Sequence, residues 1–235
     1  MEGQSVPTIP PRRWVLTPTA LCLVAVIAGC GGVGFLGTTA SSFLRHVRES
    51  DNPNVRYAAF TRLADPGCYS DEGQKAEAVR ELVAALDGGQ ESVATQAAIC
   101  RTLGALDRPE ALTVLRKTAL AEDPIVRTEA CRALGKTGTI EDATLLARVM
   151  TTDVSRDCRV AAIEALGDLS PADPRIGLTL VEGMRNPDPA IRAASYQTLK
   201  LITGQDHGFE IDRWEELAQA RLDETQPPDV RAAPR

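Results

Sequence analysis

The stretch Asp188-Pro189-Ala190-Ile191-Arg192-Ala193-Ala194 decides the fold of this chain, because four related stretches precede it. The others are Asn52-Pro53-Asn54-Val55-Arg56-Tyr57-Ala58-Ala59, Thr95-Gln96-Ala97-Ala98-Ile99-Cys100, Asp123-Pro124-Ile125-Val126-Arg127 and Cys158-Arg159-Val160-Ala161-Ala162. Each copy runs on to a leucine, and the intervals between these leucines are 40, 31, 32 and 33 residues. The leucines are Leu63, Leu103, Leu134, Leu166 and Leu199. A fixed period in this range predicts a stack of repeated structural units.

Each copy has the features of the second helix in a helical pair. At its start stands a side chain that can accept hydrogen bonds from free backbone N–H groups. These helix caps are Asn52, Asp123 and Asp188, with Ser92 and Ser155 in equivalent places. Proline follows three of the caps, at a first helical position where a missing N–H costs nothing. Gly104, Gly135 and Gly167 follow three of the leucines, and we expect them to end their helices in a left-handed conformation.

Apolar residues at helical spacing predict the first helix of each pair. The predicted first helices are Ser41–Glu49, Gln74–Leu86, Glu110–Ala121, Glu141–Met150 and Arg175–Met184. A turn-rich loop that contains Cys68 explains the one long interval. A last helix, Ile211–Leu222, is expected to cap the stack. The chain is thus divided into an N-terminal segment 1–37, a solenoid 38–224 and a tail 225–235 whose composition indicates disorder.

Composition favours helices over strands. Aromatic residues make up 4% of the chain, and the apolar 43% is carried mainly by Ala, Leu and Val, whereas strands favour β-branched and aromatic residues. We therefore predict an all-α fold, a right-handed α-solenoid of about five helical pairs plus a C-terminal capping helix. The net charge of −6 argues against nucleic acid as a partner, because nucleic-acid binding needs a clustered basic face.

The N-terminal segment has the parts of an export signal or a membrane anchor. Arg12-Arg13 precedes an apolar run that ends in Ile27-Ala28-Gly29-Cys30. This ending resembles the lipobox of bacterial lipoprotein precursors, which implies cleavage before Cys30 and lipidation of its thiol. The alternatives are a single membrane-spanning helix, since Trp14–Leu36 is 23 residues without a charge, or a cytosolic apolar helix. We favour the lipoprotein, and both leading interpretations tether the repeats to a membrane, facing the periplasm or the outside.

The remaining cysteines and the histidines form no pattern typical of a metal site, a disulfide or a catalytic site. Cys100 and Cys131 share one repeat position, and we expect them and Cys158 to be buried as small apolar side chains. His46 and His207 lie at opposite ends of the array, too far apart to form one site. We expect no metal, no cofactor and no small-molecule substrate.

Four arginines share one repeat position and should form a ladder along the solenoid. They are Arg56, Arg127, Arg159 and Arg192. They could present a row of cations to an acidic partner. We favour a structural role instead, in which each guanidinium pairs with a capping aspartate or a loop carbonyl.

The phrase Asp-Pro-x-(Val/Ile)-Arg-x-x-Ala, followed by Leu-Gly, resembles HEAT repeats of the short bacterial type, including those of phycobilisome lyases. The resemblance covers about residues 38–204 and rests on five copies. The second copy departs from it, because Gln96 replaces the arginine and Glu91-Ser92 replaces Asp-Pro. The segment Leu201–Phe209 with Trp214 looks like the C-terminal end of many bacterial HEAT-repeat proteins, where it docks the last helix.

These observations predict a non-catalytic scaffold that binds another protein at the cell envelope, because stacked helical pairs create extended surfaces. The alternative, implied by the resemblance to bilin lyases, is a lyase-like or enzyme-accessory protein. For that alternative the only loop residues with suitable chemistry are Cys68 and His207.

Overall fold

The computed structural model describes residues 37–169 and 174–225, and within them the chain forms eleven α-helices, three short 3-10 helices and no strand. The first helices of the pairs are α1 (Ala40–Glu49), α3 (Glu72–Gly88), α5 (Leu112–Thr118), α7 (Ala143–Thr152) and α9 (Pro174–Met184). The second helices are α2 (Pro53–Arg62), α4 (Val93–Leu106), α6 (Pro124–Thr137), α8 (Arg156–Leu169) and α10 (Pro189–Thr203). The last helix is α11 (Ile211–Thr225).

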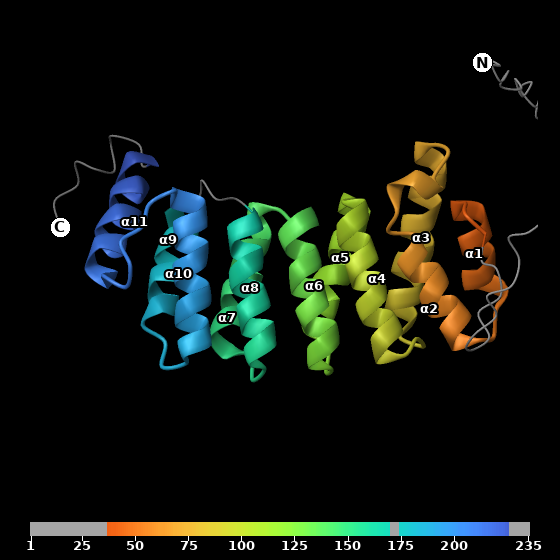
Figure 1. Ribbon diagram of the computed structural model, residues 1–235, viewed down its shortest axis with the longest axis horizontal. Helices are drawn as coiled ribbons and strands as arrows, with labels where there is room; N and C mark the ends of the chain where they lie inside the picture. The colour runs from red at the N-terminus through yellow and green to blue at the C-terminus, as the bar shows by residue number, and fades with distance from the viewer. Residues whose placement is uncertain (1–36, 170–173, 226–235) are drawn as a thin grey trace, which may run out of the picture. The chain divides into compact units, whose positions relative to one another are not determined.

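The helical pairs stack side by side in chain order (Figure 1). The most extensive packing joins successive second helices, α4 with α6 and α6 with α8. Helix α11 packs on α9 at the C-terminal end of the stack. The predicted all-α solenoid of five pairs and a terminal helix is therefore confirmed.

The predicted capping side chains begin the second helices. The side chains of Asn52, Asp123 and Asp188 accept hydrogen bonds from the backbone N–H two residues later, at 2.9, 2.8 and 2.8 Å. Ser92 accepts from the Thr95 N–H at 3.2 Å. Each cap satisfies one of the donors that a helix start leaves without an internal partner.

Several predicted boundaries were wrong. The segments predicted as Glu110–Ala121 and Glu141–Met150 each begin with a 3-10 turn, Pro109–Ala111 and Ile140–Asp142, before the α-helix proper. In the second case the Asp142 carboxylate accepts from the Thr139 N–H at 2.9 Å and tightens the turn. Thr225, assigned to the tail, ends α11, and residues 226–235 lie outside the described residues.

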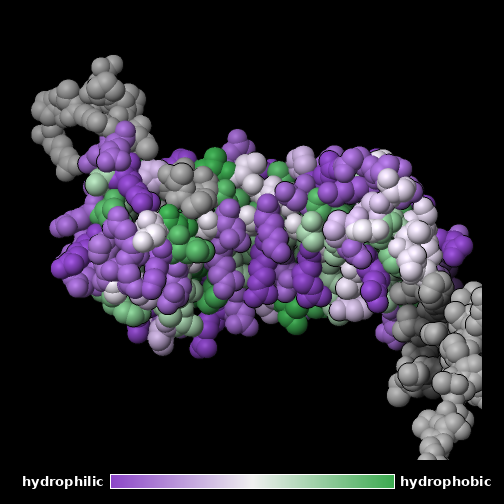
Figure 2. Space-filling view, turned by 45° about the horizontal axis from the view of Figure 1, so that its top comes forward, coloured by the Kyte–Doolittle hydropathy of each residue, from purple (hydrophilic) through white to green (hydrophobic). Residues whose placement is uncertain are grey.

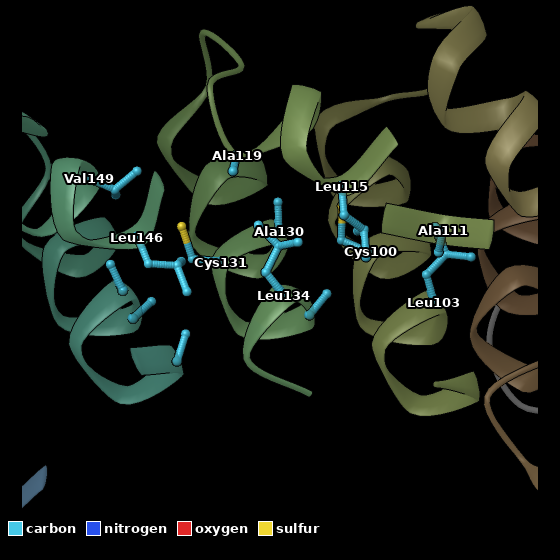
Figure 3. Close-up of a cluster of buried hydrophobic side chains, with 14 of the residues drawn as sticks. Cys100, Leu103, Ala111, Leu115, Ala119, Ala130, Cys131, Leu134, Leu146 and Val149 are labelled. Atoms are coloured by element: carbon cyan, nitrogen blue, oxygen red, sulfur yellow. The ribbon is translucent and has the colours of Figure 1, made fainter. Parts of the chain in front are cut away.

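One continuous core runs along the stack, and Figure 3 shows its middle part. The five periodic leucines are all at most 1% exposed. The predicted burial of Cys100, Cys131 and Cys158 is confirmed, since each is 0% exposed and carries a free thiol. Burial raises the pKa of Cys100 and of Cys131 to about 12, so both thiols stay protonated at neutral pH.

The three glycines after the leucines do not end their helices, which corrects the prediction. Helices α4, α6 and α8 continue two residues beyond them. A Cβ on Gly104 would lie 2.9 Å from the Ala133 Cα, and one on Gly135 would lie 2.7 Å from the Ala165 Cα. These glycines therefore allow close approach of neighbouring second helices, and Asp107 supplies the left-handed residue (φ 49°) that ends α4.

Candidate functional site

Two rows of exposed side chains run across the second helices α4, α6, α8 and α10. The first row, two residues before each periodic leucine, is Arg101, Arg132, Glu164 and Gln197. The second row, two residues after it, is Ala105, Lys136, Asp168 and Leu201. We call these eight residues the second-helix surface.

The close helix packing shapes this surface. Gly104 meets Ala133 and Gly135 meets Ala165, so small residues form a floor between neighbouring helices. The longer side chains of the two rows surround that floor. They line a hollow of about 380 Å³ across α4, α6 and α8. A second hollow of about 410 Å³ lies toward the starts of α6, α8 and α10, and it shares Glu129 and Arg132 with the first.

Charges of both signs line the first hollow. Arg101, Arg132 and Lys136 are basic, and Glu129, Glu164 and Asp168 are acidic. Glu129 is buried, with its carboxylate 2.9 Å from the Arg132 guanidinium and 3.6 Å from that of Arg101. Within the described residues, the side chains of Lys136, Glu164 and Asp168 have no ion pair, although α6 and α8 are neighbours. Figure 2 shows a face of the molecule dominated by polar and charged side chains, with apolar groups in separate patches.

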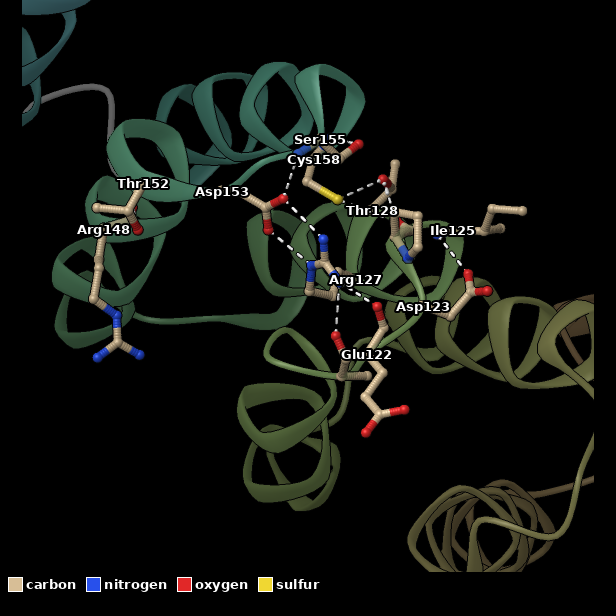
Figure 4. Close-up of polar contacts among 12 residues, drawn as sticks. Glu122, Asp123, Ile125, Arg127, Thr128, Arg148, Thr152, Asp153, Ser155 and Cys158 are labelled. Atoms are coloured by element: carbon tan, nitrogen blue, oxygen red, sulfur yellow. Dashed lines mark hydrogen bonds and ion pairs between the residues drawn. The ribbon is translucent and has the colours of Figure 1, made fainter.

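The predicted arginine ladder lies at the loops between repeats. Arg127 donates to the Ala121 and Glu122 carbonyls at 2.8 and 2.6 Å and binds the Asp153 carboxylate with two bonds of 2.8 and 2.9 Å (Figure 4). Because Asp153 follows α7, this contact ties the third pair to the fourth. The Arg127 and Asp153 side chains are only 11% and 8% exposed.

The other three arginines make related contacts. Arg56 donates to the Val47 carbonyl and to Glu91. Arg159 donates to the Met150 carbonyl at 2.7 Å, and Arg192 donates to the Asn186 and Pro187 carbonyls at 3.0 and 2.8 Å. Arg56 and Arg159 therefore bind carbonyls in the last turns of α1 and α7, whereas Arg192 binds carbonyls of the loop before its own helix. The capping residue Asp188 pairs with Arg156 at 3.1 Å.

Gln96 explains how the second copy tolerates the loss of its arginine. Its side-chain amide donates to the Glu91 carbonyl, five residues earlier, at 2.7 Å. Arg127 and Arg192 also reach carbonyls five residues earlier. A neutral amide can thus replace part of the arginine contact.

Two carboxylates at the loops are stabilised in their charged form. Burial alone would raise the pKa of Asp153, but hydrogen bonds from Arg127 and the Ser155 backbone lower it overall. Burial alone would likewise raise the pKa of Asp142, but hydrogen bonds from Arg116 and the Thr139 backbone lower it. Both carboxylates therefore stabilise the fold while they are ionised.

Cys68 and His207, the two residues considered for catalysis, are far apart. Cys68 was placed in a loop, but it lies in the 3-10 helix Pro66–Cys68, where it is buried and burial raises its pKa. His207 lies between α10 and α11 and packs edge-on against Trp214, with ring centroids 4.9 Å apart. Cys68 lies between α2 and α3 and His207 between α10 and α11, and these two pairs of helices lie toward opposite ends of the stack (Figure 1).

Cys30 and the apolar segment around it lie outside the described residues. Among residues 37–169 and 174–225, no helix has the length and apolar character to cross a membrane. The same part of the chain contains no group of three or more potential metal ligands.

The repeat pattern predicted the arginine ladder but not the second-helix surface. The positions of the periodic leucines also mark this surface. A helical residue two positions from a buried one points away from it, so the residues two before and two after each leucine mark the exposed face.

The comparison with protein families agrees with the observed architecture. No curated protein sequence matches the chain. Residues 79–167, from α3 to α8, match the family model described as HEAT repeats. The centre of the chain, which carries most of the charged part of the second-helix surface, is therefore similar to HEAT repeats.

Proposed function

We propose that this chain is a non-catalytic scaffold, tethered to a membrane, that binds another protein through its second-helix surface. HEAT repeats are commonly scaffolds for protein interaction. The observation that carries the proposal is the pair of exposed rows across α4 to α10, with side chains of both signs around a hollow.

The arrangement of charges supports this role. The arginines at the loops are occupied by carbonyls and carboxylates. Lys136, Glu164 and Asp168 are exposed and lack ion-pair partners within the described part of the chain. Charged groups of this kind can form new pairs with a partner without breaking an existing contact.

The membrane tether is inferred from the N-terminal sequence. Arg12-Arg13, the apolar run and the ending Ile27-Ala28-Gly29-Cys30 favour a lipoprotein anchored through Cys30. A spanning helix over Trp14–Leu36 would place the repeats on the same side of the membrane.

The lyase-like alternative has little support. Such an activity would need a reactive pocket, and burial disfavours thiolate formation at Cys68, one of the two residues that could serve in it. The His207 ring Nε2 lies 2.8 Å from the Gln205 side-chain oxygen, and His207 follows α10, whereas Cys68 precedes α3.

Site-specific photo-cross-linking in the source cells tests the proposal. A photoreactive amino acid is placed at Ala105 or Gln197, two uncharged and exposed positions of the second-helix surface. Matched controls carry it at Thr113 and Thr144, which are exposed on the first helices α5 and α7. We expect the same cross-linked protein from Ala105 and Gln197 and none from the controls. Cross-links from only the control positions, or from none of the four, would contradict the proposal.

A further inference from the structure

The second-helix surface changes its charge from one helix to the next. Helix α4 contributes one cation, Arg101, and α6 contributes two, Arg132 and Lys136. Helix α8 contributes two anions, Glu164 and Asp168. These are not scattered surface charges, because each occupies one of the same two repeat positions.

The next second helix, α10, continues the same two rows without charge. Helix α10 presents Gln197 and Leu201 there, and Leu201 is 75% exposed. The register is preserved on this helix, since Gly167 faces Thr198 as Gly135 faces Ala165. The surface thus has a basic part over α4 and α6, an acidic part over α8, and an apolar position over α10.

The basic and acidic parts are not paired with each other within the described residues. Arg132 pairs with Glu129 of its own helix at 2.9 Å, and no ion pair joins α6 to α8 among the described residues. Both parts line the hollow of about 380 Å³, which is open to a ligand that carries both charges. A chain segment whose acidic groups face α6 and whose basic groups face α8 would satisfy both sides at once.

From this order, and resting on the proposed function, we infer the kind of partner that the second-helix surface binds. It is an extended segment of another protein, with acidic, basic and apolar residues in that order from α4 toward α10. Neighbouring packed helices are about 8–10 Å apart, so the four helices span roughly 24–30 Å. An extended chain rises about 3.3 Å per residue, which gives about nine residues, with roughly three between successive groups.

A peptide selection on the full chain, purified in detergent, tests the inference. The probe is a displayed library of random twelve-residue peptides. We expect enriched peptides to carry an acidic residue, a basic residue about three positions away and an apolar residue about three positions beyond it. Their affinity should fall as the salt concentration rises, because the charged side chains are exposed.

A charge-swapped variant provides the decisive comparison. It carries Arg132→Glu, Lys136→Glu, Glu164→Lys and Asp168→Lys, which leaves the net charge unchanged and alters only exposed positions. We expect the wild-type peptides to bind it at least tenfold more weakly, and we expect it to select peptides with the acidic and basic residues exchanged. The control variant, with Glu110→Arg and Arg148→Glu in the first-helix layer, should select the wild-type peptides.

If the swapped variant does not fold, a milder variant with Glu164→Gln and Asp168→Asn replaces it. The peptides that this variant enriches should no longer share the basic residue, but they should still share the acidic residue. Circular dichroism verifies the helical content of each variant before selection.

Three results would overturn the inference. The first is enrichment of peptides without the charge order, or of the same peptides by the swapped variant. The second is no enrichment at all. In both cases persistent cross-links from Ala105 would leave the scaffold role standing. The third is a wild-type dimer that the Glu164→Gln and Asp168→Asn variant converts to a monomer, because the occupant would then be a second copy of this chain.

Discussion

Replacing Gly135 by alanine tests whether close contact between second helices holds the stack together. The new Cβ would lie 2.7 Å from the Ala165 Cα and 2.9 Å from its Cβ. Ordinary van der Waals contacts of a Cβ begin near 3.4 Å, so α6 and α8 must move about 0.7 Å further apart. A gap of that size forfeits roughly a quarter to a half of the dispersion energy across the contact. We expect the overpacking to cost about 3 kcal/mol, offset by about 1 kcal/mol from the better helix propensity of alanine.

Gly88 provides the matched control, because it also lies in a helix but a Cβ there would meet nothing within 4 Å. Chemical unfolding followed by circular dichroism should show Gly135→Ala less stable than wild type by about 2 kcal/mol. Gly88→Ala, at the last residue of α3, should be at least as stable as wild type. A Gly135→Ala variant as stable as the wild type would refute the argument that this glycine is needed for helix contact.

Further predictions concern the loops, the core and the N-terminus. Asp153→Asn should lower the unfolding free energy by about 3 kcal/mol, because it leaves the mostly buried Arg127 guanidinium without its carboxylate; urea unfolding unchanged from wild type would exclude this role. The pKa of Asp153 is lowered in the folded state, so its contribution to the unfolding free energy is present above about pH 4 and is lost as pH falls further. A urea midpoint measured from pH 6 to 3 should therefore fall less in Asp153→Asn than in wild type, and equal falls would contradict the assignment. Ser195→Ala should match wild-type stability or exceed it by about 1 kcal/mol, since the buried Ser195 Oγ lacks a hydrogen bond; a clear loss on thermal unfolding would disprove this. Mass spectrometry of the N-terminal peptide from membrane extracts should show a diacylated peptide starting at Cys30, whereas an intact Met1 terminus would favour the spanning helix.

The sequence predicted most of the architecture because its signals are local. A capping aspartate such as Asp123 acts within its own turn, and a leucine such as Leu134 repeats at a fixed interval. Both features are determined by a few neighbouring residues. The prediction failed for Gly135, because glycine after a helical leucine fits two different roles. Only the position of Ala165 on the next second helix, α8, decides between a helix end and a close helix contact. Ala165 is 30 residues away in the sequence.

In the candidate site, too, contacts within a few residues could be predicted, and contacts between distant residues could not. The guanidinium of Arg127 was expected to hold a loop, and its bonds to the Ala121 and Glu122 carbonyls lie in the loop just before its own helix. Its bond to Asp153 depends on how the third pair stacks on the fourth, which a local pattern does not contain. The hollow across α4, α6 and α8 also could not be predicted, because it depends on which residues of neighbouring second helices meet.

The burial of Trp214 gives the solenoid a fluorescent reporter at one end. Its ring is fully buried, and its Nε1 donates to the Gly208 carbonyl at 2.9 Å. The chain has only one other tryptophan, Trp14, so Trp14→Phe makes the emission report on the docking of α11 alone. Circular dichroism of the same sample reports on all helices together. Comparing the two signals during unfolding would show whether the last helix detaches before the rest of the stack melts.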